Sequence, residues 1–167
     1  MITYRELKVE ETEKFWEFMN ILDQETEYMM YEPGERKECS SLDKLRANVK
    51  NAVEKEDFLF IAEENKQLVG FLWAERGQFH RIAHTAYIVA GILKDYRGQG
   101  IGTSLFKRLN DWAKQEKIVR LELTVECQNE AAFHLYQKNG FKVEGKREKS
   151  MYVNGTYVDE YYMAKIL

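Results

Sequence analysis

The sequence has one proline, two cysteines and no excess of charge of either sign. Its 167 residues include 25 basic and 28 acidic side chains, a formal net charge of -3. This balance lacks the basic surface that nucleic-acid binding needs, so we expect no nucleic-acid partner. Cys39 and Cys127 lie far apart and match no metal-ligand spacing. We therefore expect two free thiols in a reducing cytoplasm and no metal site.

Long hydrophobic runs are also missing. No apolar run approaches the ~20 residues that a membrane-spanning helix needs, and the residues after Met1 become charged at once. We expect neither a signal peptide nor a membrane anchor. No repeat, low-complexity tract or linker interrupts the chain, and an apolar content of 44% can fill one core. The sequence therefore predicts a single domain over residues 1–167.

Apolar periodicity predicts a mixed α/β (α+β) sheet domain. The expected strands cover residues 2–9, 58–62, 68–74, 82–93, 119–125, 141–153 and 156–166, and the expected helices cover 10–22, 41–55, 100–117 and 129–140. Ser41 can cap the second helix. Asn154-Gly155 is a strong hairpin signal. Residues 25–41, which include the only proline, are expected to form a mobile loop.

The glycine-rich stretch from residue 92 to residue 102, ILKDYRGQGIG, joins an apolar strand to an amphipathic helix. Glycines let the backbone approach a ligand closely, so several N–H groups can converge on one anion. Arg97 adds a fixed positive charge, and the following helix offers its unpaired first-turn N–H groups. The stretch predicts a pyrophosphate cradle, and a plain strand-to-helix turn is the alternative.

Two common phosphate-binding motifs do not fit this stretch. The dinucleotide fingerprint needs glycines at its first, third and sixth positions. The sixth residue is Thr103 when counted from Gly98 and Leu105 when counted from Gly100. A P-loop needs Gly-Lys-Ser/Thr, which is absent. A nicotinamide-binding oxidoreductase is therefore only a distant alternative.

The stretch resembles the acetyl-CoA motif of the GNAT superfamily of N-acetyltransferases, Arg/Gln-x-x-Gly-x-Gly/Ala, through Arg97, Gly100 and Gly102. A second family element is an Asn that leads into a short helix with Leu-Tyr and then Gly-Phe. It is matched by Asn129, Leu135, Tyr136, Gly140 and Phe141. The likeness extends over essentially the whole chain, and it is strongest to small bacterial members related to ribosomal-protein and small-amine acetyltransferases. It implies a single mixed, mostly antiparallel sheet of about seven strands flanked by about four helices.

The resemblance also implies an acetyl-CoA site and no metal. The co-substrate is expected where strands 82–93 and 119–126 separate, with the backbone of residues 90–93 paired to its pantetheine arm. The implied binding residues are Ile92, Leu93, Arg97, Gly98, Gln99, Gly100, Ile101, Gly102, Thr103, Asn129 and Tyr136.

Tyr136 is the implied general acid for the departing thiolate, because a tyrosine hydroxyl can donate its proton to a thiolate. A core aromatic is the alternative for Tyr136, and a simple helix cap is the alternative for Asn129. The general base stays open. The family often has a glutamate on the core strand, where this chain has Ala86 and Tyr87. Glu75 and His84 remain as candidates.

These features predict an acetyl-CoA-dependent N-acetyltransferase that acts by direct transfer in a ternary complex. The acceptor would be a primary amine of a protein N-terminus, a polyamine or another small amine. The alternative is a GNAT-fold acyl-CoA-binding sensor or interaction module without turnover. Segment 25–41 and the terminal hairpin are expected to set acceptor specificity, and the exposed hairpin edge suggests a homodimer.

Overall fold

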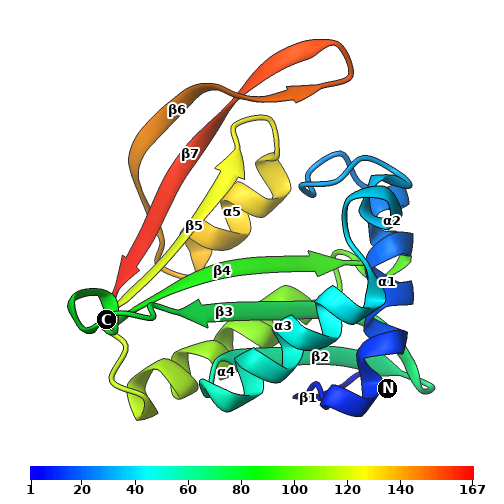
Figure 1. Cartoon of the computed structure of the whole chain (residues 1–167). Coiled ribbons are helices and arrows are strands. Elements are labelled where there is room, and N and C mark those ends of the chain that lie inside the picture. The colour runs from blue at the N-terminus through cyan, green and yellow to red at the C-terminus, as the bar shows by residue number, and fades with distance from the viewer.

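The computed structural model describes all residues, 1–167. Its seven strands form one sheet in the order β1-β2-β3-β4-β5-β7-β6 (Figure 1). The strands are β1 Thr3–Glu6, β2 Phe58–Glu64, β3 Gln67–Arg76, β4 Thr85–Ile92, β5 Arg120–Glu126, β6 Lys142–Val153 and β7 Thr156–Ile166. Only β4 and β5 run parallel to each other. The predicted mixed, mostly antiparallel sheet is confirmed.

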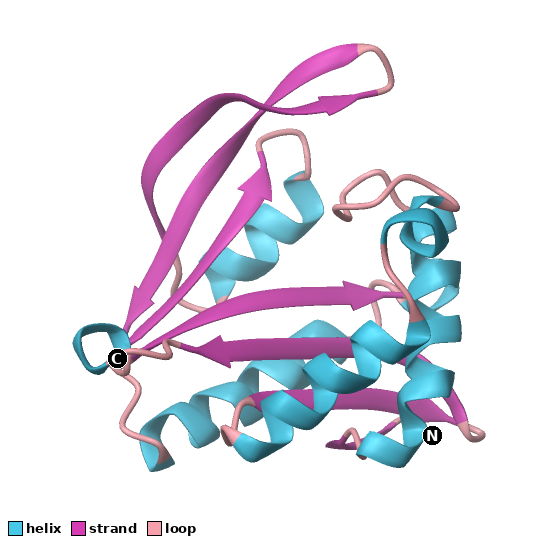
Figure 2. Ribbon diagram, in the orientation of Figure 1, coloured by secondary structure: helices cyan, strands magenta, loops and turns pink.

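Helices cover both faces of the sheet (Figure 2). The α-helices are α1 Thr12–Glu25, α2 Glu35–Cys39, α3 Leu42–Glu54, α4 Ile101–Gln115 and α5 Glu130–Lys138, and single 3-10 turns lie at Val9–Glu11, His80–Ile82 and Lys94–Tyr96. Helices α1 and α3 pack on one face, where Phe15 contacts Phe71 edge to face at 5.4 Å. Helices α4 and α5 pack on the other face, through residues such as Leu105 of α4 and Leu135 of α5. No helix of the chain is both long enough and apolar enough to span a bilayer.

Local signals in the sequence set several element boundaries. Ser41 Oγ accepts a hydrogen bond from Lys44 N at 3.2 Å and begins α3, as expected. Asn154 and Gly155 take φ values of 49° and 79°, which a tight primed turn between β6 and β7 requires. Both cysteines are free thiols.

The expectation of a mobile loop over residues 25–41 is wrong at its C-terminal end, where α2 forms. Arg36 on α2 makes a paired contact with Asp23 on α1, at 2.7 Å and 3.0 Å, and both side chains are buried. Arg36 also lies over the ring of Tyr31 at 4.7 Å. A helix of five residues has too few turns to show an apolar period, so this tertiary ion pair was not visible in the sequence pattern.

Strands β4 and β5 separate after a short paired stretch. Their ladder runs only from Thr85↔Arg120 to Tyr87↔Glu122, whereas the ladder between β4 and β3 continues to Ile92. Beyond Tyr87 the two strands diverge, and the sheet opens into a V with β4 as one arm and β5 as the other (Figure 1). We call this opening the splay. Its position agrees with the separation expected for strands 82–93 and 119–126.

Candidate active site

The arm of the splay formed by β4 carries unpaired backbone. Leu93 N donates to Val69 O at 2.9 Å, so the Leu93 amide faces β3. Backbone groups alternate between the two sides of a strand, which places those of Ala90 and Ile92 on the side of β5. Because β5 has already turned away, the N–H and C=O groups of Ala90 are free to pair with an extended ligand. The predicted ligand contact of Leu93 cannot use its amide, which is already bonded.

The glycine turn after β4 presents open space to a ligand. Gly98 and Gly100 have φ values of 73° and 81°, and a Cβ built on either residue would meet nothing within 4 Å. The first backbone bond of α4 runs from Ser104 N to Gly100 O at 3.0 Å. The N–H groups of Ile101 to Thr103 therefore have no acceptor inside the helix. Converging N–H groups above an open, glycine-lined turn fit a pyrophosphate.

Other residues of the turn have structural roles. A Cβ on Gly102 would lie 2.7 Å from Leu135 Cδ2, so this glycine allows α4 to approach α5. Arg97 Nε donates to Ile92 O at 3.0 Å, and Gln99 Nε2 donates to Asp95 O at 3.0 Å. These side chains brace the turn. Their predicted contacts with the co-substrate stay predictions.

Tyr136 and Asn129 lie at the arm formed by β5 and α5. The ring of Tyr136 packs edge to face on Phe106 at 5.7 Å and tilts against Phe141 at 6.1 Å. Burial raises the pKa of the Tyr136 hydroxyl to about 12, and the nearby Tyr87 hydroxyl acts in the same direction. Asn129 Oδ1 accepts from Ala132 N at 3.3 Å and caps α5. The cap leaves the Asn129 amide nitrogen available to a ligand.

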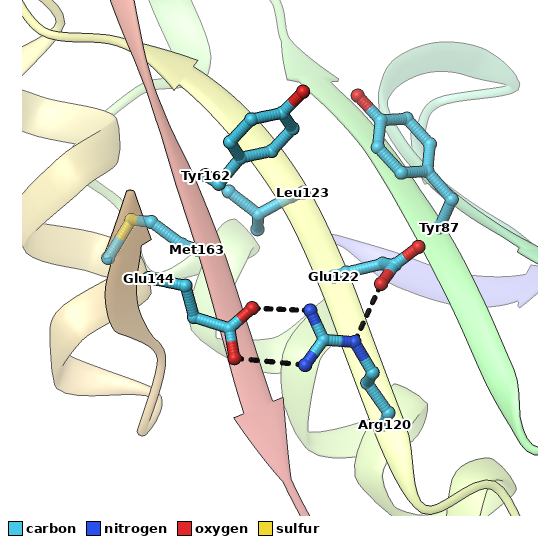
Figure 3. A pocket seen from close by; sticks show the side chains of 7 residues that line it. All are labelled: Tyr87, Arg120, Glu122, Leu123, Glu144, Tyr162 and Met163. Atoms are coloured by element: carbon cyan, nitrogen blue, oxygen red, sulfur yellow. Dashed lines mark hydrogen bonds and ion pairs between the residues drawn. The ribbon is translucent and has the colours of Figure 1, made fainter. Parts of the chain in front are cut away.

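A pocket of about 300 Å³ lies at the closed end of the splay (Figure 3). Arg120 occupies its floor between Glu122, at 2.7 Å, and Glu144. The two carboxylates raise the pKa of the guanidinium, and Arg120 in turn lowers the pKa of Glu144. The rings of Tyr87 and Tyr162 rise above this paired floor, as Figure 3 shows. The floor offers no unpaired charge to a ligand.

The two predicted candidates for the general base lie away from the open part of the splay. Glu75 is opposite Tyr87 in the β3–β4 ladder, largely exposed, and 3.5 Å from Lys55 Nζ. His84 is exposed in the turn before β4. Its carbonyl oxygen accepts from Val119 N at 2.8 Å, which ties β5 to β4 below the splay. Their role as bases stays a prediction.

A different carboxylate, Glu126, lies at the end of β5 and was missed in the sequence. Only 5% of it is exposed, and its Oε2 has no hydrogen-bond partner. Burial raises the pKa of Glu126, and Glu160 and Glu27 raise it further. Strand alternation places Glu126 on the same face as Glu122 and predicts a half-exposed side chain there. The one signal in the sequence for a role of Glu126 was its position three residues before Asn129 of the family motif.

The second cavity, of about 530 Å³, lies between the α1–α2 segment and the β6–β7 hairpin. It is lined by residues 24–33, Arg97 and residues 151–154. Asn154 Nδ2 donates to Glu27 Oε1 at 2.7 Å, which connects the two segments across the cavity. Tyr28 Oη donates to Gln128 O at 3.5 Å, just beyond β5. The segments expected to set acceptor specificity therefore meet beside the open end of the splay.

Comparison with known proteins identifies relatives of this chain. The chain is 32% identical over 103 residues to an L-amino acid N-acetyltransferase of Escherichia coli, covering 59% of this chain and 62% of that protein. It is 31% identical over 100 residues to a spermidine N(1)-acetyltransferase of the same organism, covering 59% and 52%. The matches thus span less than two thirds of these relatives.

Similarity to a solved structure covers the whole chain. An acetyltransferase of the GNAT family from Streptococcus pneumoniae superposes with a TM-score of 0.92 at 26% identity, over 100% of both chains. The model of the acetyltransferase (GNAT) family matches residues 15–141, which include the glycine turn, Asn129 and Tyr136. The chain therefore belongs to the acetyltransferase (GNAT) family.

Proposed function

We propose that this protein transfers an acetyl group from acetyl-CoA to a primary amine. The observation that carries the proposal is the continuity between the unpaired edge of β4 and the open glycine turn of α4. An extended pantetheine arm can pair with the free backbone groups of β4. The pyrophosphate of the same molecule can accept hydrogen bonds from the N–H groups of the glycine turn. Membership of the family and the names of the relatives support the same activity.

The chain's own residues would promote direct transfer. Acetyl-CoA supplies an acetyl thioester, and the amine nitrogen forms the new C–N bond as the C–S bond breaks. The Tyr136 hydroxyl is the proton donor to the departing thiolate, because it is protonated at neutral pH and lies on α5 beside the splay. The backbone N–H of Ala90, which faces the splay, can donate to the thioester oxygen.

The amine must lose a proton before it attacks the thioester, and Glu75 and His84 are the candidates to accept it. Neither lies in the open part of the splay, so a water between the amine and the base would complete the proton path.

The test is release of free CoA thiol from acetyl-CoA in the presence of a panel of primary amines, together with calorimetric titration of CoA. Saturable CoA binding with amine-dependent thiol release is the expected result. Tight CoA binding without turnover of any amine would instead support the acyl-CoA sensor. A cytoplasmic location and a homodimeric state, both expected from the sequence, stay predictions.

A further inference from the structure

Glu126 Oε2 is the one buried side-chain polar atom of this chain without a hydrogen-bond partner. An unsatisfied buried acceptor destabilises the fold, and more so when it is charged. Nearly all buried polar groups in proteins avoid this cost by finding a partner. A carboxylate kept in this state at the open end of the splay needs a donor, which a ligand can bring.

Nearby carboxylates favour the binding of a cation beside Glu126. Glu160 is its direct partner across β5 and β7, and like charges in opposite positions of a ladder repel each other. Glu27, from the α1–α2 segment, adds a third negative charge close enough to raise the pKa of Glu126. Only Arg147, which donates to Glu160 at 3.3 Å, offsets this charge. Three carboxylates and one guanidinium leave an excess of two negative charges.

The other contacts of these carboxylates hold them in place without neutralising them. Ser150 Oγ donates to Glu160 Oε1 at 2.8 Å, and Asn154 Nδ2 donates to Glu27 Oε1 at 2.7 Å. Both donors are neutral and come from the β6–β7 hairpin. Glu27 and Asn154 also line the cavity of about 530 Å³. Through Glu27, the negative cluster borders a space that can admit a small molecule.

We propose that Glu126, together with Glu160 and Glu27, binds an ammonium group of the acceptor, and that the acceptor is an aliphatic diamine or polyamine without a carboxylate. This inference rests on the proposed acetyltransferase function. An alkylammonium has three N–H donors, which match an unpaired carboxylate and its neighbours. An ammonium held in this way stays protonated and cannot attack a thioester, so it is the second, non-reacting amine of the acceptor.

The same cluster disfavours an amino acid as acceptor. The α-carboxylate of an amino acid would add a fourth negative charge to a partly buried site, where repulsion is only weakly screened. The two relatives described above are named for these two substrate classes. The charge around Glu126 favours the polyamine class for this chain.

Three amines with the same five-carbon chain test the proposal: cadaverine, pentylamine and lysine. Cadaverine differs from pentylamine by the second ammonium and from lysine by the missing carboxylate. We expect kcat/KM for cadaverine to exceed that for pentylamine by at least about tenfold, because a hydrogen bond to a charged group contributes about 1.5–3 kcal/mol. Lysine should be the poorest of the three. Equal values for cadaverine and pentylamine, or a preference for lysine, would overturn the proposal.

Two variants test whether Glu126 is responsible for the advantage of cadaverine over pentylamine. Glu126→Gln keeps the shape of the side chain and should abolish the advantage of cadaverine over pentylamine. Glu148→Gln, at an exposed position of β6, is the matched control and should keep the advantage. An advantage that persists in Glu126→Gln would place the ammonium elsewhere and refute the assignment.

The proposed function can fail separately from this inference. If no amine releases thiol from acetyl-CoA, the transferase proposal is wrong, and cadaverine binding is then measured by calorimetry in the presence of CoA. Binding to the wild-type protein that is lost in Glu126→Gln supports the ammonium site without catalysis. No binding to the wild-type protein overturns it.

Discussion

The hydroxyl of Tyr87 lies 2.9 Å from Thr124 Oγ1, and this contact bridges β4 and β5 just beyond their last paired residues. The bridge is exposed, so its net contribution to stability is small. We expect Tyr87→Phe to lower the free energy of unfolding by no more than about 1 kcal/mol, measured by urea denaturation. Tyr152→Phe, on the exposed hairpin, should change it less. A loss of several kcal/mol would mean that the bridge holds the strands together.

Gly100→Val should abolish binding of acetyl-CoA while the chain stays folded. The new side chain enters the open space above the turn, and the φ of 81° at this position adds strain of about 1–3 kcal/mol. Gly34→Val is a matched control, because Gly34 has a φ of 84° and equally open surroundings. Circular dichroism and calorimetric titration with CoA check both variants. Unchanged affinity in Gly100→Val would remove the pyrophosphate from this turn.

Tyr136→Phe should lower kcat by about 10²-fold and leave the affinity for acetyl-CoA nearly unchanged, because it removes a proton donor but keeps the ring packing. Steady-state kinetics with a reactive amine provide both constants. With a pKa of about 12, wild-type Tyr136 stays protonated well above neutral pH. Wild-type values of both constants in the variant would exclude Tyr136 as the acid.

Glu126→Gln should make the protein more stable at pH 7. The pKa of Glu126 is raised in the folded chain, first by burial and then by Glu160 and Glu27, so folding favours the protonated form. The cost of the charge is therefore absent below the ordinary pKa of 4.5 and appears as the pH rises through the raised value. We expect a gain of about 1 kcal/mol at pH 7 that disappears below about pH 4. Denaturation of both proteins at the two pH values measures it.

The ion pair between Asp23 and Arg36 should hold α2 against α1. Arg36→Met leaves the buried Asp23 carboxylate without its partner and should cost about 3–5 kcal/mol. Replacing Asp23 with Leu in the same chain should recover much of this loss, because no buried charge remains. Thermal unfolding of the single and double variants tests the coupling. Equal stability of the single and the double variant would mean that the unpaired Asp23 carboxylate does not destabilise the fold.

Local patterns were sufficient to predict most of the fold. The alternation from residue 119 to residue 125 predicted β5, whose Leu121, Leu123 and Val125 are buried. Asn154 and Gly155 predicted the hairpin, and Ser41 predicted the start of α3. Each of these signals depends on residues close in sequence, where backbone preference and one buried face determine the outcome.

The parts that were missed depend on contacts between distant segments. Glu126 is buried because β7 and the α1–α2 segment cover the end of β5. The alternation of apolar and polar residues along β5 predicts neither of these contacts. Arg36 is buried because a carboxylate 13 positions earlier in the chain lies opposite. The family motif predicted the donor site and offered no base on the core strand. Glu75 and His84 were candidates by residue type alone, without knowledge of the direction in which β4 and β5 open.

Strand β7 lies between β5 and β6 although it follows both in the chain. During synthesis on the ribosome, β5 therefore emerges with one edge open to the splay and the other waiting for a strand that is made some 30 residues later. The nascent chain can complete the half of the sheet that contains β1 to β4 first. The ammonium site proposed at Glu126, which needs Glu160 on the neighbouring strand, is therefore assembled only after β7 has been translated.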